Sequence, residues 1–295
     1  MHSHYKVLLA MVISSQFVFS TLYASETTSP ATSPPEPHPP QTTEDKPQWE
    51  LGVGIGYISL PHYRGSDQRQ DYVAPIPYVR YRGKRLNVDR EGGRFYFVDR
   101  AAWKLDLSAA FAFPVDSEDN RARTGMTDLD PILEIGPRLT WYIYASADER
   151  FRIRAGFPVR LAVNLSGIEN TGWIFSPYLQ FRYFSTMETA ISIGPMWATE
   201  KYHDYYYQVD SQYVIPGTRP AYDAKAGYSG LRITLTNSHR VSKHWWWGIF
   251  ARYDSLSGAT FEDSPLVKQN DALMGGFALS YIFNPVKEYY EDQIE

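Results

Sequence analysis

The chain of 295 residues contains no cysteine, which excludes disulfide bonds, thiolate metal ligands, cysteine nucleophiles and a lipidated N-terminal cysteine. Its formal net charge of -4 provides no basic field for nucleic acid, so we expect no nucleic-acid partner. Beyond the first two dozen residues, no stretch approaches the roughly 20 apolar residues that a transmembrane helix needs. If this chain crosses a membrane, it must therefore cross with β-strands.

The first 48 residues cannot build a packed core. Residues 1–24 read as a cleaved export signal, because Lys6 precedes an interrupted apolar stretch and Ala24 offers a small residue for cleavage. A retained anchor is the alternative, and Ser14 and Gln16 within the apolar stretch argue against it. Residues 25–48 are rich in proline, threonine and serine, which predicts a disordered periplasmic spacer, or alternatively a tether that docks a partner.

A strict alternation of side chains runs from Phe151 to Asn164. One parity is entirely apolar from Phe151 to Val163, whereas the other carries Arg152, Arg154 and Arg160. Successive side chains of a strand point to opposite faces, so only an extended strand separates these two sets. The segment therefore predicts a strand with one oily face and one ionic face.

The same signature recurs in the segments near 49–60, 71–82, 102–114, 130–144, 172–184, 187–198, 226–237, 243–254 and 271–283. We expect their charged faces to line a common lumen, formed by Glu50, Arg80, Asp106, Glu134, Arg138, Arg152, Arg154, Arg160, Arg182, Glu188, Arg232 and Arg252.

The charged faces decide which side of the sheet is outside. A dry core could not hold so many ions, since each buried charge costs several kcal/mol even when paired. The apolar faces then need lipid, and strands of this length match the ~25 Å apolar band of an outer-membrane barrel. The alternative is a soluble sandwich or a lipocalin-like barrel with its apolar faces inward. The 16% aromatic content favours the membrane form, whose lipid boundaries carry aromatic girdles.

Counting strands predicts an all-β, transmembrane, antiparallel up-and-down barrel over residues 49–283. Short turns and long links alternate, as they do in outer-membrane barrels with both termini in the periplasm. Long links are expected at 114–129, 166–171, 199–225 and 255–270. The parity closes at twelve strands if 84–90 and 94–98 form a short hairpin around Gly92 and Gly93, and ten strands is the fallback. Residues 284–295 then form a periplasmic tail.

Several short motifs in the expected loops resemble, in the same order, those of the MltA-interacting protein family, also called MipA/OmpV. The resemblance runs from about Trp49 to Phe283. The motif residues are Tyr63, Arg64 and Gly65; Asn120 and Arg121; Asp128 and Asp130; His203, Asp204 and Tyr205; Asp223; Asp254; and Asp263 and Pro265.

This resemblance implies a Gram-negative outer-membrane protein in contact with lipid and lipopolysaccharide. It also implies a non-catalytic scaffold for peptidoglycan-remodelling enzymes, namely a lytic transglycosylase and a murein synthase. Other members of the family are linked to adhesion or antibiotic uptake, so a small-solute or antibiotic-permeable channel and a surface adhesin stay open as alternatives. The proline-rich segment 25–48 and the tail after Phe283 depart from the family pattern.

The sequence contains no convincing catalytic or metal-binding motif. His203, Asp204 and Asp223, with Ser211 nearby, are the strongest candidates, yet the common hydrolase and metalloprotease signatures are missing. The acidic loop at 116–130 lacks the alternating spacing of a Ca²⁺ loop, so we expect a solvated loop rather than a metal site. We therefore expect no enzyme, cofactor or metal. Tyr202, Tyr205, Tyr206, Tyr207 and Tyr213 read equally as an adhesive surface or as a membrane girdle.

Overall fold

The fold was analysed in a computed structural model, which describes residues 48–82, 86–89, 92–100 and 102–286. The expected signal peptide, nearly all of the proline-rich spacer and residues 287–295 of the expected tail lie outside these ranges. Within them, no helix combines the length and apolar character needed to span a membrane.

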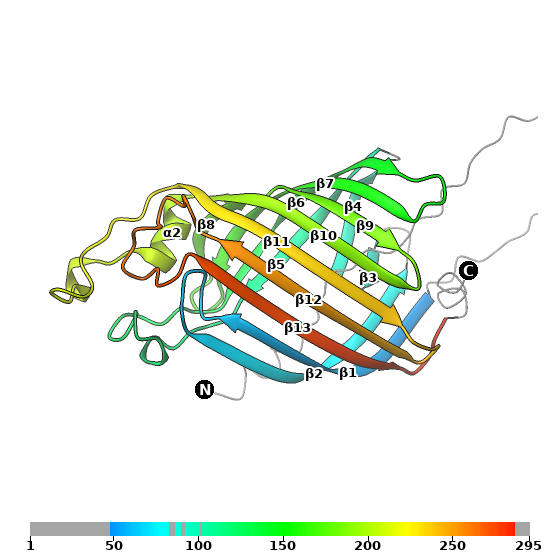
Figure 1. Cartoon of the computed structure of the whole chain (residues 1–295), viewed down its shortest axis with the longest axis horizontal. Coiled ribbons are helices and arrows are strands. Elements are labelled where there is room, and N and C mark those ends of the chain that lie inside the picture. Colours follow the sequence, from blue (N-terminus) through cyan, green and yellow to red (C-terminus); the bar gives the residue numbers. More distant parts are fainter. Residues whose placement is uncertain (1–47, 83–85, 90–91, 101, 287–295) are drawn as a thin grey trace, which may run out of the picture.

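One antiparallel sheet accounts for nearly all of the regular structure, and it closes on itself because β1 pairs with β13 (Figure 1). Its strands are β1 (Gln48–Pro61), β2 (Arg69–Arg82), β3 (Leu86–Asp89), β4 (Gly92–Asp99), β5 (Trp103–Ala112), β6 (Ile132–Ala145), β7 (Phe151–Asn164), β8 (Glu169–Phe175), β9 (Tyr178–Phe184), β10 (Met187–Ala198), β11 (Gly227–Arg240), β12 (Trp245–Ser255) and β13 (Asp271–Ile282). Three short helical segments lie in the connections: η1 (Ser117–Asp119), α2 (Glu200–Tyr207) and η2 (Ser211–Tyr213).

The barrel has twelve strand positions, as the alternation of links predicts. β8 and β9 both pair with β7 on one side and with β10 on the other, so they are two halves of one strand. The interruption falls at Ser176 and Pro177, where proline cannot donate a ladder hydrogen bond. The expected short hairpin is present as β3 and β4, but Gly92 and Gly93, which were expected in its turn, lie within β4 and pair with Asp89 and Val88. Twelve strands rather than ten are thus confirmed.

The connections differ from expectation in two places. The link expected to be long at 166–171 is short, because β8 already begins at Glu169 and pairs with Asn164. The long link after β10 contains the helix α2, which the sequence analysis did not predict. Figure 1 shows α2 and the long loops gathered at one end of the barrel, opposite the turns that join β11 to β12 and β9 to β10. In outer-membrane barrels the long loops are extracellular and the short turns are periplasmic.

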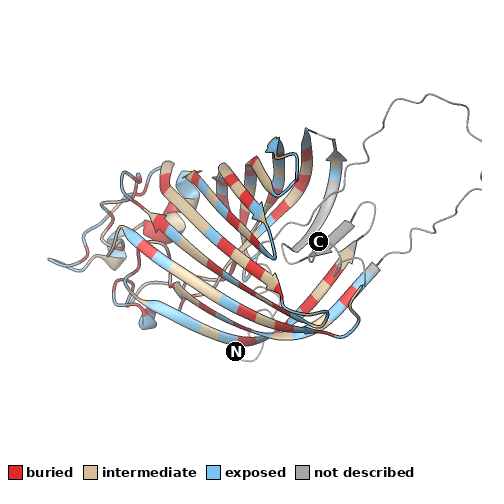
Figure 2. Ribbon diagram, turned by 45° about the vertical axis from the view of Figure 1, so that its right-hand side comes forward, coloured by how far each residue is buried: buried red, intermediate tan, exposed pale blue. Residues whose placement is uncertain are grey.

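The strands turn their apolar faces outward and their charged faces inward. Along β1 the outward Leu51, Val53 and Ile55 are 44%, 48% and 53% exposed, whereas the inward Glu50 is fully buried. Figure 2 shows the same alternation of buried and exposed positions along the other strands. An apolar exterior and an ionic interior exclude the soluble alternative, because its apolar faces would point inward.

One sector of the interior is nevertheless apolar. The inward faces of β1, β2, β12 and β13 contribute an apolar cluster, made of Ile58, Ala74, Ile76, Tyr78, Trp246, Phe250, Ala278 and Ile282. Leu60, Tyr72 and Met274 are partly buried against it. The lumen is therefore divided into an ionic part and an oily part.

A charge placed on the outer face of β7 tests whether that face contacts lipid. Val159 is 39% exposed near the middle of the strand, so Val159→Arg would place a cation in hydrocarbon and cost about 2–4 kcal/mol of folding free energy. Urea unfolding in lipid vesicles, followed by heat-modifiable gel migration, measures the loss. Val159→Leu is the matched control and should change stability little. Equal stability of the two variants would contradict an outward-facing Val159.

Candidate functional site

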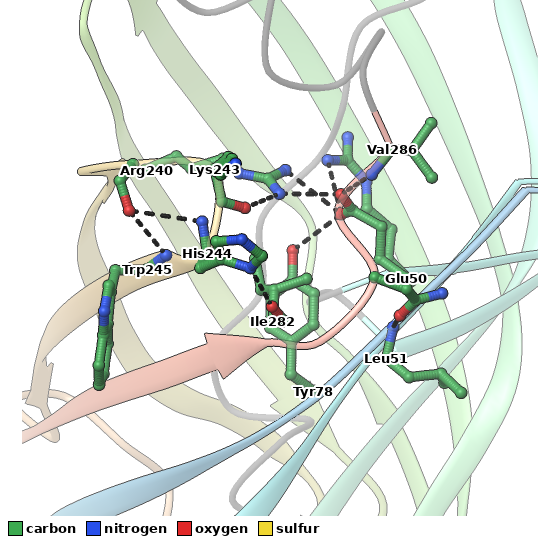
Figure 3. Close-up of polar contacts among 12 residues, drawn as sticks. Glu50, Leu51, Tyr78, Arg240, Lys243, His244, Trp245, Ile282 and Val286 are labelled. Atoms are coloured by element: carbon green, nitrogen blue, oxygen red, sulfur yellow. Dashed lines mark hydrogen bonds and ion pairs between the residues drawn. The ribbon is translucent and has the colours of Figure 1, made fainter.

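The interior of the barrel is the candidate functional site, and its turn end is built around Glu50 on β1. The carboxylate accepts hydrogen bonds from Arg240 of β11 at 2.9 and 3.3 Å, and it lies 3.7 Å from Arg80 of β2. The Tyr78 hydroxyl at 3.3 Å and the backbone N–H of Val286 at 2.9 Å also donate to it (Figure 3). Because Glu50 and Arg240 stand on strands separated by β12 and β13, their ion pair ties together the segment in which the barrel closes.

The chain that follows β13 is fastened to the same place. The Asn284 side chain accepts from the Leu51 N–H at 2.7 Å and donates to the Trp49 carbonyl at 2.8 Å, as a further strand residue would. Two residues later, Val286 reaches the inward-facing Glu50 (Figure 3). The described end of the chain, up to Val286, therefore lies along the inside of the turn end.

Farther along the lumen, most ion pairs join neighbouring strands. Asp106 accepts two hydrogen bonds from Arg138 at 2.9 and 2.8 Å, and these residues are direct partners in the β5–β6 register. The other pairs are Arg160 with Glu134 at 2.9 Å, Arg232 with Asp254 at 2.7 Å, and Arg182 with Glu188. These pairs run along the wall, whereas the Glu50–Arg240 pair spans two intervening strands.

The remaining cations of the expected lumen set are held in different ways. Arg154 donates to Gln180 at 2.7 Å, and Arg152 pairs with Glu149 in the turn after β6 at 2.7 Å. Arg252 contacts the Met274 sulfur at 3.6 Å, and its buried Nε has no hydrogen-bond partner among the described residues. Arg154 is buried, and Arg152 and Arg252 are half-buried, each at a position of the charged parity of its strand.

The loop end of the barrel is closed by a packed cap, which we define as α2 together with the loops 62–68, 113–131 and 256–270. Tyr202 of α2 donates to Glu134 in the lumen at 3.0 Å, and Tyr205 donates to the Asp130 carbonyl at 3.0 Å. The Tyr207 ring stacks on Phe261 with centroids 3.7 Å apart. The helix thus sits in the mouth of the barrel and reaches the ionic interior.

The other loops are joined to α2 and to one another by buried hydrogen bonds. Tyr63 donates to the Leu266 carbonyl at 2.8 Å, and Arg123 donates to the Tyr206 carbonyl at 3.2 Å. Asn120 donates to Ser66 at 3.0 Å and contacts the His62 ring at 3.1 Å. Burial raises the pKa of Tyr63, so its hydroxyl keeps its proton at neutral pH, and burial lowers the pKa of Arg123.

Most of the motif residues that the resemblance placed in separate loops converge in or beside this cap. Gly65 turns the first loop at φ 95° and accepts from Lys268, while the Arg64 carbonyl accepts from Tyr207 at 2.9 Å. Arg64 also lies 3.5 Å from Asp254, which links the cap to the lumen. Asp128 accepts from the Ser117 N–H at 2.8 Å, and Asp130 accepts from Ser166 at 2.7 Å.

The other motif residues lie nearer the surface. Arg121 pairs with Asp67 at 2.9 Å, Asp223 pairs with Lys225, Asp263 is exposed and Pro265 is half-buried.

His203, the strongest catalytic candidate, fastens α2 to the barrel. The ring is fully buried, with Nδ1 2.5 Å from the Lys225 carbonyl and Nε2 2.7 Å from the Ser229 hydroxyl. A carbonyl only accepts, so Nδ1 carries the proton and Nε2 accepts from Ser229. Asp204 does not complete a triad, and one of its buried oxygens has no hydrogen-bond partner among the described residues. The arrangement is a closed clasp without access for a substrate.

The tyrosine cluster forms neither an adhesive surface nor a girdle. Tyr206 and Tyr207 are buried, and Tyr202 and Tyr205 are half-buried within the cap. The helix explains this result, because it turns all four rings inward over the mouth of the barrel. Sequence reasoning also missed Arg240 and Asn284. Arg240 continues the inward parity of β11 beyond the predicted end of that strand at residue 237.

Among the described residues, no group of three or more histidine or acidic side chains could hold a metal ion. The acidic side chains of the loop at 116–130 act instead as local hydrogen-bond acceptors. Asp116 accepts from the Glu118 N–H, and Glu118 accepts from the Gly125 N–H.

A closed sheet with an apolar belt outside and ion pairs inside defines an outer-membrane β-barrel. The sequence model of the family described as MltA-interacting protein MipA matches residues 53–283, and the chain belongs to that family. The MltA-interacting protein of Escherichia coli (strain K12) is 25% identical over 243 residues, which cover 80% of this chain and 90% of that relative. The relative from Shigella flexneri matches to the same extent.

Solved structures resemble the chain more distantly. A bacterial polysaccharide outer-membrane secretin aligns with 8% identity and a TM-score of 0.43, covering 79% of this chain and 98% of that one. An outer-membrane channel from Pseudomonas putida F1 aligns with 10% identity and a TM-score of 0.41, covering 79% and 96%.

Removing the Glu50 carboxylate tests the cluster at the turn end. Glu50→Ala would leave the buried Arg240 and Arg80 without this anion, and loss of a buried partner costs about 3–5 kcal/mol. The temperature at which the folded gel band disappears should fall accordingly. Glu149→Ala breaks a pair that is about half exposed to solvent and should cost at most about 1 kcal/mol. Equal effects of the two substitutions would argue against a structural role for Glu50.

The His203 clasp predicts an acid-labile cap. Burial holds the pKa of this imidazole below its usual 6.5, so the unfolded cap binds the proton more tightly than the folded cap. The contribution of His203 is complete above pH 6.5 and is lost as the pH falls through the lowered pKa. Protease cleavage of the loop at 199–226 should therefore accelerate between about pH 7 and pH 5.

His203→Gln should weaken this pH dependence. His62→Gln is the control. It removes the other imidazole of the cap, which is half-buried and whose pKa is also lowered by burial. Cleavage that stays independent of pH in the unmodified chain would contradict the clasp.

Proposed function

We propose that this outer-membrane barrel is a non-catalytic scaffold that holds a lytic transglycosylase of the MltA type at the inner face of the membrane. The observation that carries the proposal is the likeness over 80% of the chain to a protein named for its interaction with MltA. A murein synthase is the second partner that we propose. Membrane lipid and lipopolysaccharide would contact the outer belt and the loop end.

The closed interior supports a scaffold over an enzyme. The only histidine of α2 is enclosed by backbone and hydroxyl groups, and the carboxylates of the lumen are occupied by cations. A catalytic acid or base needs a reachable substrate position within hydrogen-bond distance. Neither the His203 clasp nor the Asp106 pair offers such a position.

The turn end is the surface that a periplasmic partner would meet. Val241, in the turn between β11 and β12, is 59% exposed, and the turn after β6 presents Asp148 and Arg150 to solvent. Phe283, just past β13, is 60% exposed at the same end. The proline-rich residues 25–48 precede β1 and would add an extended segment beside this rim.

A small-solute channel is the second candidate, and it is favoured by the inward arginines, among which Arg252 has an unpaired buried Nε within the described residues. The cap opposes it because α2 fills the mouth and hydrogen-bonds to Glu134 inside. The two functions differ in one direct measurement. A steady open conductance in planar bilayers would favour the channel, and its absence would favour the scaffold.

A pull-down tests the scaffold. The full-length chain, extracted in mild detergent, should retain a purified lytic transglycosylase of the MltA type. Val241→Arg changes the exposed turn end and should weaken retention by about tenfold, the effect of losing roughly 1.4 kcal/mol of binding free energy. Ile215→Arg is the matched control, since Ile215 is 45% exposed in a loop at the opposite end and should leave retention unchanged.

Deleting residues 25–48 in the same assay separates a tether from a plain spacer, because only a tether would contribute to retention. Failure of the unmodified chain to retain the transglycosylase, with or without this segment, would contradict the scaffold. An equal loss in Val241→Arg and Ile215→Arg would contradict docking at the turn end.

A further inference from the structure

The barrel wall is incomplete between β2 and β5. β2 pairs with β1 along its whole length from Arg69 to Arg82, yet on its other side it pairs with β3 only at Tyr81 and Arg82. β5 pairs with β6 from Trp103 to Ala112, but with β4 only from Lys104 to Asp106. Above the short β3–β4 hairpin, the facing edges of β2 and β5 therefore have no strand partner among the residues that the structure describes.

The sequence of β2 is suited to an open edge. Pro75 and Pro77 lie in the unpaired span and, being two residues apart, direct their backbone nitrogens to the same side. Proline has no N–H to leave unsatisfied, which is why it is confined to edge strands within sheets. An exposed edge in hydrocarbon otherwise costs several kcal/mol for each unpaired backbone group. The two prolines remove part of that cost at the gap.

Both faces of the open edge are apolar. On the outer face Val73 is 64% exposed, and on the inner face Ala74, Ile76 and Tyr78 belong to the apolar cluster of the lumen. The opposite edge, on β5, carries the short side chains of Ala109, Ala110 and Ala112. A path across the wall would therefore meet few polar side chains.

Two features bound the gap. At the turn end it is limited by the β3–β4 hairpin, where three inter-strand steps of about 4.8 Å separate β2 from β5. Toward the loop end, the Tyr72 and Phe113 rings stack with centroids 4.7 Å apart. The two edges thus converge toward the loops, and the opening between these limits lies in the half of the wall nearer the cap.

The gap leads to the oily sector of the lumen rather than to its ion pairs. Ile58, Ile76 and Phe250 are buried there, with Met274 partly buried against them. The cap lies over the loop end of the lumen, where Tyr202 donates a hydrogen bond to Glu134. The sector is therefore oily, lies below the cap and is adjacent to membrane lipid at its side.

We propose that the gap between β2 and β5 is a lateral port that admits a single apolar chain of an amphiphile dissolved in the outer leaflet. The chain lies against Ile58, Ile76 and Phe250, while its polar head stays at the membrane surface near the loop end. Continuity of the port with the lipid-facing belt, and the apolar character of both faces of β2, identify a hydrocarbon chain as the occupant. A hydrated solute would find few polar partners along this path.

Photolabelling of the full-length chain in lipid nanodiscs tests the port. The probe is dodecanoic acid with a diazirine at the end of its chain, and peptide mapping locates the adducts. Adducts are expected on the inward Ile58, Ile76 or Phe250, and excess unlabelled dodecanoic acid should compete them away. Adducts confined to outward residues such as Leu51 and Val53 would overturn the proposal, because they report only the lipid that surrounds any barrel.

Two neighbouring positions of β2 provide matched variants. Ala74 faces the lumen and is 5% exposed, so Ala74→Trp should crowd the apolar cluster beside the gap and lower inward labelling by about fivefold or more. Val73→Trp places the same ring on the lipid side, where it should leave inward labelling within about twofold. Heat-modifiable migration verifies that both variants are folded. Undiminished inward labelling in folded Ala74→Trp would contradict entry of the chain beside Ala74.

A cross-link across the gap tests the route without enlarging a side chain of the lumen. The chain has no cysteine, so Val73→Cys on β2 combined with Ala109→Cys on the facing edge of β5 offers the only two thiols to a bifunctional reagent that can span up to three inter-strand steps of about 4.8 Å. Cross-linking before the probe is added should abolish inward labelling, and the same double variant without cross-linking should retain it. Equal inward labelling with and without the cross-link would show that the chain enters elsewhere and would overturn the lateral port.

Discussion

The fold depends on the requirement that backbone N–H and C=O groups within hydrocarbon be paired. A sheet of this kind satisfies the requirement only by closing, and here closure is made by the β1–β13 pairing from Gly52 to Ser59. The buried Glu50 with Arg240 and the side chain of Asn284 fasten the same seam at the turn end. Polar groups thus hold together the place where the first and last strands meet. This explains why a fully buried carboxylate is retained at that position.

Most ion pairs of the lumen join residues on neighbouring strands. A cation on one strand lies within reach of an anion on the next strand, as Arg138 is to Asp106 and Arg232 is to Asp254. Such pairs need no bridge across the barrel, so the interior can be ionic without being filled by ion pairs. The space that they leave is closed at the loop end by α2 and, on one side, is lined by the apolar cluster around Phe250.

Much of the architecture could be read from the sequence because alternation leaves a strong signal. The facing of β7 follows directly from its three arginines, and the alternation of long and short links required the short hairpin that brings the total to twelve strands. The helix α2 escaped detection because its sequence has no apolar stripe. Its tyrosines are buried only by contacts with distant loops, such as the stacking of Tyr207 on Phe261.

The site was harder to predict than the fold because it depends on distant contacts and on register. Parity predicts which charges share one face of a strand, but it could not show that Glu50 meets Arg240 from a strand three positions away in the sheet. The sequence shows each group of motif residues in a separate loop. These loops meet in one cap only because the barrel closes. Pro75 and Pro77 are the sequence feature that marks the unpaired edge of β2. They could not be interpreted in this way until the structure showed that the partner strand β3 is short.

The cap covers the loop end of the barrel, which leaves the turn end and the gap beside β2 as surfaces for other molecules. The cap joins four segments through buried hydrogen bonds, including those of Tyr63, Arg123 and His203, so it resists opening as a unit. The proposed periplasmic partner would meet the turn end, whereas the proposed lipid-soluble molecule would meet the gap beside β2. These surfaces are separated by the β3–β4 hairpin. A scaffold and a lateral port can therefore coexist in one barrel, because each uses a face that the other leaves free.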